Sequence, residues 1–288
     1  MVAVGTRDVV VGVDGSAGAA PALRWATAEA ARRGGRLRVV RAYRAPWPPA
    51  HPPAGVGRKT WALMRTEETV SGMVDDARAA APGLVVIGLS VHGAPVPVLM
   101  AAAADGALTV VGHRGHEGFA GLRLGSTGLQ LATHAGGPVV VVRGTPDAAA
   151  PVLLGADGST GAEPAIGSAF QAAAERGCGV VAVRVYQIPA PKWDDRVDPL
   201  DYNLERLQEV EHLELRRAIA PWRDKYPEVP VEMSVRLGEP ADLLTAMSAA
   251  ASLVVVGTRG HGGFTGMLLG SVGQKLLHHA HCPVMIAR

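Results

Sequence analysis

The sequence predicts an α/β protein built from two tandem doubly wound domains, each with a five-stranded parallel sheet. Three observations support this. The chain has 288 residues, about the size at which a single core gives way to two domains. Its second half repeats its first: residues 112–143 align with residues 257–288 without a gap, and 17 of the 32 aligned positions are identical. Short valine-rich runs also alternate with helical patterns along each half.

The repeat extends to the start of each half and places the domain boundary. The segment Val11–Ser16 aligns with Leu154–Ser159. Between the two halves, Gly144–Ala150 is composed mainly of small residues and includes a proline, as expected of a linker. We therefore expect one domain over residues 1–146 and a second over residues 147–288.

The strand candidates of the first half are nearly all apolar, which is typical of a parallel sheet buried on both faces. They are Val9–Val13, Leu37–Tyr43, Leu84–Val91, Leu108–Val111 and Val139–Val142. The helical patterns between them are Gly18–Arg33, Trp61–Ala80, Val96–Ala104 and Leu122–His134, and the second half adds a long charged helix at Asn203–Lys225. With right-handed crossovers, we expect the strand order 3-2-1-4-5. Two proline-rich loops should follow the second strand of each half, at Arg44–Lys59 and Tyr186–Asp198.

Composition and charge exclude several classes of protein. The net charge is only +2 and no dense Lys/Arg block occurs, so nucleic-acid binding is not favoured. No run of 18 apolar residues indicates a membrane span or a signal peptide, and we expect a cytoplasmic protein. Cys178 and Cys282 are too far apart in the sequence to suggest a metal site, and two thiols are no disulfide framework.

Glycines follow the fourth strand of each half with the same spacing. The pattern Gly112-x2-Gly115-x9-Gly125-Ser126 recurs as Gly257-x2-Gly260-x9-Gly270-Ser271. Glycine lets backbone N–H groups approach an anion without a Cβ in the way, and the start of the next helix adds partial positive charge. In an open α/β sheet the ligand crevice lies where the winding reverses, beside the first and fourth strands here. The duplicated spacing therefore predicts a phosphate-binding loop in each half.

Charged residues flank both predicted crevices. Asp14 and Asp157 end the first strand of each half, before Gly-Ser. Such an aspartate either caps a turn, or accepts hydrogen bonds from a ribose hydroxyl or helps to coordinate Mg²⁺. Arg114 and Arg259 either add positive charge for a nucleotide tail or are solvated surface residues.

At these residues the sequence resembles the universal stress protein family in its tandem, ATP-binding form, over essentially the whole chain. The resemblance implies two domains packed as an internal pseudo-dimer through their fifth strands, each able to hold one ATP, with or without Mg²⁺. Val272 departs from the pattern, because it removes the hydroxyl that Thr127 supplies in the first half. The nucleotide-contacting residues are then expected to be Gly12, Val13, Asp14, Ala42, Gly112, Arg114, Gly115, Gly125, Ser126 and Thr127 in the first half, and Ala156, Asp157, Val185, Gly257, Arg259, Gly260, Gly270, Ser271 and Val272 in the second.

The function expected from these features is a stress-response regulator whose nucleotide occupancy modulates conformation or assembly, with slow or no hydrolysis. Two alternatives stay open: an enzyme that hydrolyses ATP or transfers an adenylyl group, and a scaffold whose crevices are empty. The sequence His113-Arg-Gly-His116 matches a nucleotidylyltransferase signature but follows the fourth strand rather than the first, and Thr258 replaces its first histidine in the second half. A homodimer and a regulatory protein partner are also compatible with the sequence.

Overall fold

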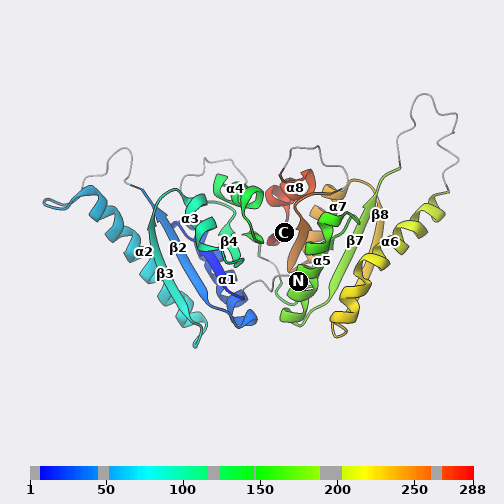
Figure 1. The fold of residues 1–288 in the computed structure, drawn as a ribbon, viewed down its shortest axis with the longest axis horizontal. Coiled ribbons are helices and arrows are strands. Elements are labelled where there is room, and N and C mark those ends of the chain that lie inside the picture. Colours follow the sequence, from blue (N-terminus) through cyan, green and yellow to red (C-terminus); the bar gives the residue numbers. More distant parts are fainter. Residues whose placement is uncertain (1–6, 45–51, 116–123, 146, 189–202, 261–267) are drawn as a thin grey trace, which may run out of the picture. The chain divides into compact units, whose positions relative to one another are not determined.

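The computed structural model describes residues 7–44, 52–115, 124–145, 147–188, 203–260 and 268–288. The chain forms two compact units, Met1–Arg143 and Gly144–Arg288. Each unit contains a parallel five-stranded sheet with helices packed on it (Figure 1). The predicted α/β class is confirmed.

Unit 1 has the strand order β3-β2-β1-β4-β5, as predicted. Helices α1 and α2 pack against each other, and so do α3 and α4. Right-handed crossovers place these two pairs on opposite faces of the sheet. The elements in chain order are β1 (Val9–Gly12), α1 (Ala19–Arg33), β2 (Leu37–Tyr43), α2 (Arg58–Ala80), β3 (Val86–His92), α3 (Pro95–Ala102), β4 (Leu108–Gly112), α4 (Ser126–His134) and β5 (Val139–Val142).

Unit 2 repeats this topology, with the strand order β8-β7-β6-β9-β10. A 3₁₀ turn precedes its first α-helix, and another follows its third. The elements are β6 (Val152–Gly155), η1 (Thr160–Ala162), α5 (Glu163–Arg176), β7 (Val180–Tyr186), α6 (Leu204–Lys225), β8 (Val231–Leu237), α7 (Pro240–Met247), η3 (Ser248–Ala250), β9 (Leu253–Gly257), α8 (Ser271–His279) and β10 (Val284–Ala287).

The sequence accounts for these elements through burial and capping. The three inner strands of each sheet are covered on both faces, and most of their valines and leucines are almost fully buried, the half-buried Val181 and Val185 of β7 excepted, which explains the absence of polar alternation. Helices α1 and α5 both end at a left-handed glycine, Gly34 and Gly177, the usual C-terminal stop. Asn203 caps α6 by accepting a hydrogen bond from the Arg206 amide at 2.9 Å.

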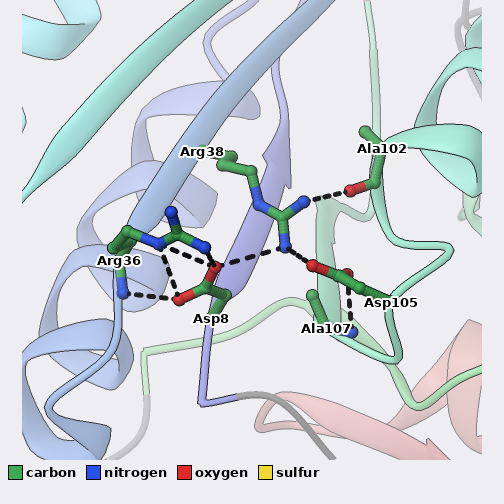
Figure 2. A network of polar contacts seen from close by, with 6 residues as sticks. All are labelled: Asp8, Arg36, Arg38, Ala102, Asp105 and Ala107. Carbon is green, nitrogen blue, oxygen red and sulfur yellow. Dashed lines mark hydrogen bonds and ion pairs between the residues drawn. The ribbon is translucent and has the colours of Figure 1, made fainter.

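An ion-pair network ties together the amino-terminal ends of the strands in unit 1 (Figure 2). The carboxylate of Asp8, 6% exposed, accepts hydrogen bonds from the guanidinium of Arg36 at 2.6 and 3.0 Å, and from the Arg36 backbone amide at 3.0 Å. Arg38 donates to the carbonyl of Ala102 at 2.7 Å and to the carboxylate of Asp105 at 2.6 Å. The network lies at the end of the sheet away from the predicted crevice.

Two predicted helix starts differ from the structure by more than one residue. Helix α2 begins at Arg58, three residues before the predicted start, and α4 begins at Ser126 rather than at Leu122. Apolar periodicity continues through Leu124, but Gly125 adopts extended backbone angles (φ −74°, ψ 152°) and caps the helix. The two proline-rich loops lie largely outside the described residues. No helix in the described ranges is both long and apolar enough to cross a bilayer.

Candidate functional site

The predicted crevice of unit 1 lies at the carboxyl ends of β1 and β4, and glycines let the loops after these strands meet. A Cβ on Gly112 would lie 2.5 Å from the carbonyl oxygen of Gly18. A Cβ on Gly115 would lie 2.5 Å from a carboxylate oxygen of Asp14. A Cβ on Gly112 would therefore force two backbone segments apart, whereas a Cβ on Gly115 would push the Asp14 carboxylate out of its present position.

Unit 2 repeats this arrangement atom for atom. A Cβ on Gly257 would lie 2.5 Å from the carbonyl oxygen of Gly161. A Cβ on Gly260 would overlap the carboxylate of Asp157, whose Cγ would be 3.3 Å away. The first two glycines of each motif thus hold the strand-one aspartate against the loop after the fourth strand.

The third glycine of each motif has a different environment. A Cβ on Gly125 would meet its nearest described neighbours at 3.7–3.9 Å, among them the carbonyl oxygen of His113 and the backbone nitrogen of Gly115. A Cβ on Gly270 would meet its nearest neighbours at 3.6–3.7 Å. Both glycines have φ values that any residue adopts, −74° and −70°. Neither the backbone conformation nor the described packing requires glycine at these two positions. Space for a ligand beside the loop would explain why glycine occurs there.

Backbone donors converge at this third glycine. Gly125 and Gly270 are the N-caps of α4 and α8, and neither helix has a side-chain cap. The first N–H groups of an α-helix have no acceptor within the helix, and its N-terminus carries partial positive charge. The glycine amide itself bonds to the loop, from Gly125 N to His113 O and from Gly270 N to Thr258 O, both 2.8 Å. Each loop is therefore fixed beside a helix start able to bind an anion.

The two aspartates act first as turn residues. In each unit one carboxylate oxygen accepts the backbone amide two residues ahead, Ser16 onto Asp14 and Ser159 onto Asp157, both at 2.9 Å. The residue between them is a glycine with φ near +80°. The second carboxylate oxygen points toward the loop after the fourth strand. The turn-capping role is thus present in the fold, and the second oxygen lies beside the crevice.

The second strand of each unit presents backbone groups beyond the end of the first strand. In unit 1 the last β1–β2 hydrogen bond among the described residues runs from Val13 N to Val40 O at 3.0 Å. In a parallel strand alternate residues direct their backbone groups to the same neighbour, so Ala42 faces the side where β1 has ended. Unit 2 has the matching bond from Ala156 N to Val183 O at 3.0 Å, with Val185 in the equivalent place.

The remaining predicted residues have mixed environments. The side chains of Val13 and Ala156 are buried in the core, so only their backbone can face a ligand. A Cβ on Gly12 would lie 2.7 Å from a methyl group of Leu99 on α3, so this side chain would have to move. Arg114 and Arg259 are exposed, as are Ser126 and Ser271 at the helix starts, whereas Thr127 and Val272 are half-buried.

Comparison with known proteins gives the family. The sequence pattern of the Universal stress protein family matches residues 5–143 and again residues 150–288. The chain belongs to the universal stress protein family. A universal stress protein of Mycobacterium tuberculosis is 37% identical over 298 residues, covering 97% of this chain and 96% of that protein. One of Mycolicibacterium smegmatis is 36% identical over 295 residues, with the same coverage. The crystal structure of a universal stress protein from Archaeoglobus fulgidus has a TM-score of 0.69 at 17% identity and covers 98% of both chains.

In this universal stress protein the imidazole of His113 is part of the fold. Its Nδ1 lies 3.3 Å from the carbonyl oxygen of Val142 on β5. Burial lowers the pKa of His113 from its ordinary value of 6.5, the bond to Val142 opposes this shift, and nearby Arg143 and Arg114 add to it. The contact with Val142 holds the imidazole against β5 and so positions the loop after β4. His116, the other histidine of the signature, lies outside the described residues.

Sequence analysis did not identify two pairs of residues that lie at the predicted site. Gly18 and Gly161 provide the carbonyl groups that meet the loop after the fourth strand, and a Cβ on either would collide with or crowd the carbonyl of Arg114 or Arg259. Arg41 and Arg184 place their guanidinium groups against the positive-φ glycine of the strand-one turn. Both pairs share the 143-residue spacing of Asp14 and Asp157, so the repeat itself contained the signal. Within the described ranges, no cluster of three His, Cys, Asp or Glu side chains forms a metal site.

Proposed function

We propose that each unit of this universal stress protein binds one adenine nucleotide, foremost ATP, in the crevice between the loops after its first and fourth strands. The phosphates would accept hydrogen bonds from the loop amides and the N-terminus of α4 or α8. The ribose hydroxyls would donate to Asp14 or Asp157. The base would bond to the backbone of Ala42 or Val185. Nucleotide occupancy would regulate the conformation or assembly of the protein during the stress response, with slow or no hydrolysis.

The observation that carries this proposal is the environment of Gly125 and Gly270. The other motif glycines are required by contacts within the protein, whereas these two have ordinary backbone angles and no close described neighbour. Glycine in that position, at the start of an otherwise uncapped helix, is what phosphate binding needs. The same environment occurs in both units, which makes coincidence a poor explanation.

Mg²⁺ would fit this crevice only as a companion of the phosphates. Asp14 and Asp157 each direct a carboxylate oxygen toward the loop after the fourth strand, and Mg²⁺ bound to a nucleotide typically takes one or two protein carboxylates besides phosphate and water. When bound, the ion would neutralise phosphate charge. Asp14 and Asp157 would hold it or the ribose in either case.

An ATP-hydrolysing or adenylyl-transferring enzyme is the second candidate, and the described groups favour it less. Proton transfer requires a base within hydrogen-bond reach of the reacting atom. His113 is bonded to the β5 backbone and is absent from unit 2, where Thr258 replaces it. Turnover by the purified protein separates the candidates. A kcat near the common enzyme value of ~10 s⁻¹ favours the enzyme, and stable nucleotide retention with negligible turnover favours the regulator.

The direct test of the site is Gly125→Ala, Gly270→Ala and the double variant. The new methyl would cover the loop beside the Gly115 amide, or its counterpart in unit 2, without a clash in the described packing. Native mass spectrometry of the protein as purified, followed by calorimetry with ATP, should show two nucleotides in the parent, one in each single variant, and an affinity at least about tenfold weaker at each altered site. Gly136→Ala, where a Cβ meets nothing within 4 Å, is the control.

The possible outcomes distinguish the site from the activity. Unchanged stoichiometry in the double variant would show that the nucleotide binds elsewhere. No nucleotide in the mass spectrum of the parent, together with a flat titration with millimolar ATP, would refute nucleotide binding altogether.

A further inference from the structure

One arginine in each unit lies against the turn that follows the first strand. In unit 1, Nη1 of Arg41 would be 3.8 Å from a Cβ on Gly15, directly after Asp14. In unit 2, Arg184 is even closer to Gly158, with its Cζ 3.3 Å from the same position. Both side chains extend from the second strand of their sheet, next to the residue proposed to receive the base. Each crevice therefore has a guanidinium at its rim.

The partners of Arg41 are neutral. Its Nη1 donates to the hydroxyl of Thr69 on α2 and, at 3.5 Å, to the carbonyl oxygen of Arg65. No described carboxylate forms an ion pair with Arg41. Burial lowers the pKa of Arg41, Arg65 adds to this, and the carboxylate of Asp14 opposes it, but a guanidinium remains charged at any pH of interest.

The partner of Arg184 is a carboxylate. Its Nε forms a short ion pair with Glu211 on α6, and the two side chains are only 13% and 18% exposed. Asp157 of unit 2 corresponds to Asp14 of unit 1, and Arg259 corresponds to Arg114. These two positions therefore carry the same charges in both units. Glu211 thus introduces a negative charge beside the unit 2 crevice that the described part of unit 1 does not match at Arg41.

We propose that the two crevices differ in charge selectivity: unit 1 prefers ATP over adenosine more strongly than unit 2, because Glu211 cancels the charge of Arg184 while Arg41 keeps its own. This inference rests on nucleotide binding as proposed above. Arg41 and Glu211 are then specificity-determining residues that act through charge on the phosphates rather than through contact with the base.

The size of the effect follows from Coulomb's law. One unit charge acting on a triphosphate of charge about −4 at ~10 Å, in water-like dielectric, changes affinity about five- to tenfold at 10 mM ionic strength. Screening reduces the change to about twofold to threefold at 150 mM. Adenosine has no charge, so its affinity should be the same at the two sites and independent of salt.

The test reads one site at a time and exchanges the charge. Gly270→Ala leaves the unit 1 site for ATP, and Gly125→Ala leaves the unit 2 site. Adenosine has no phosphate for the added methyl to exclude, so it still binds both sites and serves as the uncharged reference in each background. In each background, calorimetry with Mg²⁺-free ATP and with adenosine gives the ratio of their affinities at 10 and 150 mM ionic strength. Glu211→Gln should raise that ratio in unit 2 about five- to tenfold at low salt, and Thr69→Glu should lower it in unit 1 by a similar factor. Arg41→Gln should also lower the ATP-to-adenosine affinity ratio of unit 1, and it replaces Thr69→Glu as the test if that variant does not fold.

Matched controls change the same charge on the outer side of the same helix. Glu209→Gln removes an exposed carboxylate on the opposite side of α6 from Glu211, and Ser71→Glu adds one at an exposed position of α2 on the opposite side from Thr69. Neither should change the ratio by more than about twofold. Equal ratios at the two sites of the parent, or ratios unmoved by Glu211→Gln and Arg41→Gln, would overturn the charge selectivity and leave nucleotide binding intact. Failure of the parent to bind either compound would overturn both.

Discussion

Gly112 lies against the carbonyl group of Gly18, so close that a Cβ would be 2.5 Å from the oxygen. This contact joins the loop after β1 to the loop after β4, and unit 2 repeats it between Gly257 and Gly161. The glycines of one motif therefore have two separate tasks. Gly112 and Gly115 assemble the crevice, and Gly125 leaves one side of it open.

Gly112→Ala should destabilise unit 1 by about 1–3 kcal/mol, because the methyl group must displace backbone rather than a flexible side chain. Gly125→Ala should cost less, up to about 1 kcal/mol, because it creates no backbone overlap and only replaces glycine by the poorer N-cap alanine. Urea denaturation of both variants measures the difference. The comparison variant is Gly72→Ala on α2, where a Cβ meets nothing within 4 Å and alanine should stabilise the helix by about 0.5–1 kcal/mol. Equal stability of the Gly112 and Gly125 variants would refute the division of tasks.

Much of the fold could be predicted because its signals are local. Buried parallel strands appear as continuous apolar runs, and the strand order follows from their alternation with helices. The start of α4 could not be predicted, since the apolar pattern continues through Leu124 and only backbone geometry places the cap at Gly125.

The roles within the site were harder to predict than its position. Spacing alone does not tell at which glycine a Cβ would overlap a carbonyl group and at which it would make only ordinary contacts, because this depends on how two distant loops approach each other. The partners of Arg41 and Arg184 depend on how the following helix packs across the second strand. Thr69 and Glu211 lie 28 and 27 residues from their arginines, and no local pattern links them.

Asp14 should contribute separately to the turn and to ribose binding. Asp14→Asn keeps an oxygen acceptor for the Ser16 amide, whereas Asp14→Ala removes it and should cost about 1 kcal/mol of stability, as loss of a cap does. A carboxylate that accepts from ribose hydroxyls should give the unit 1 site a preference for adenosine over 2′,3′-dideoxyadenosine. Asp14→Asn should reduce this preference markedly, as measured by calorimetry in the Gly270→Ala background. A preference that persists in Asp14→Asn would leave Asp14 with the turn alone.

His113 should lose its proton at a lower pH than an ordinary histidine. Its pKa in the folded protein lies below the ordinary value, chiefly because of burial. Stability contributed by the neutral imidazole is therefore fully present above about pH 6.5 and is lost as the pH falls from there through the folded pKa. NMR titration of the imidazole should give a midpoint below 6.5. Between pH 7 and 8 His113 does not titrate, so it should contribute no pH dependence to the ATP affinity of unit 1. A midpoint above 6.5, abolished in His113→Thr, would contradict this assignment.

Asp8 should make the acid stability of unit 1 different from that of unit 2. The hydrogen bond from Arg36 is the largest cause that lowers the pKa of Asp8 below its ordinary 3.8, with burial acting in the opposite direction and Arg38 adding to the lowering (Figure 2). A depressed folded pKa means that this contribution to stability is fully present above about pH 3.8 and is lost as the pH falls through the folded value.

Hydrogen exchange of the β1 and β2 amides, followed by mass spectrometry between pH 3 and 7, measures the contribution of Asp8 to the stability of these strands. The exchange rates are corrected for the intrinsic pH dependence of amide exchange. Protection of these strands should fall below pH 4, and Asp8→Asn should lower protection at neutral pH and flatten its pH dependence. Unit 2 has Pro151 at the equivalent position, so β6 is an internal reference that lacks the carboxylate. Asp75→Asn, which alters an exposed pair with Arg78 at 3.9 Å, should leave the profile unchanged because such pairs contribute little. If Asp8→Asn and the parent lose protection in parallel as the pH falls, the acid sensitivity of unit 1 does not originate at Asp8.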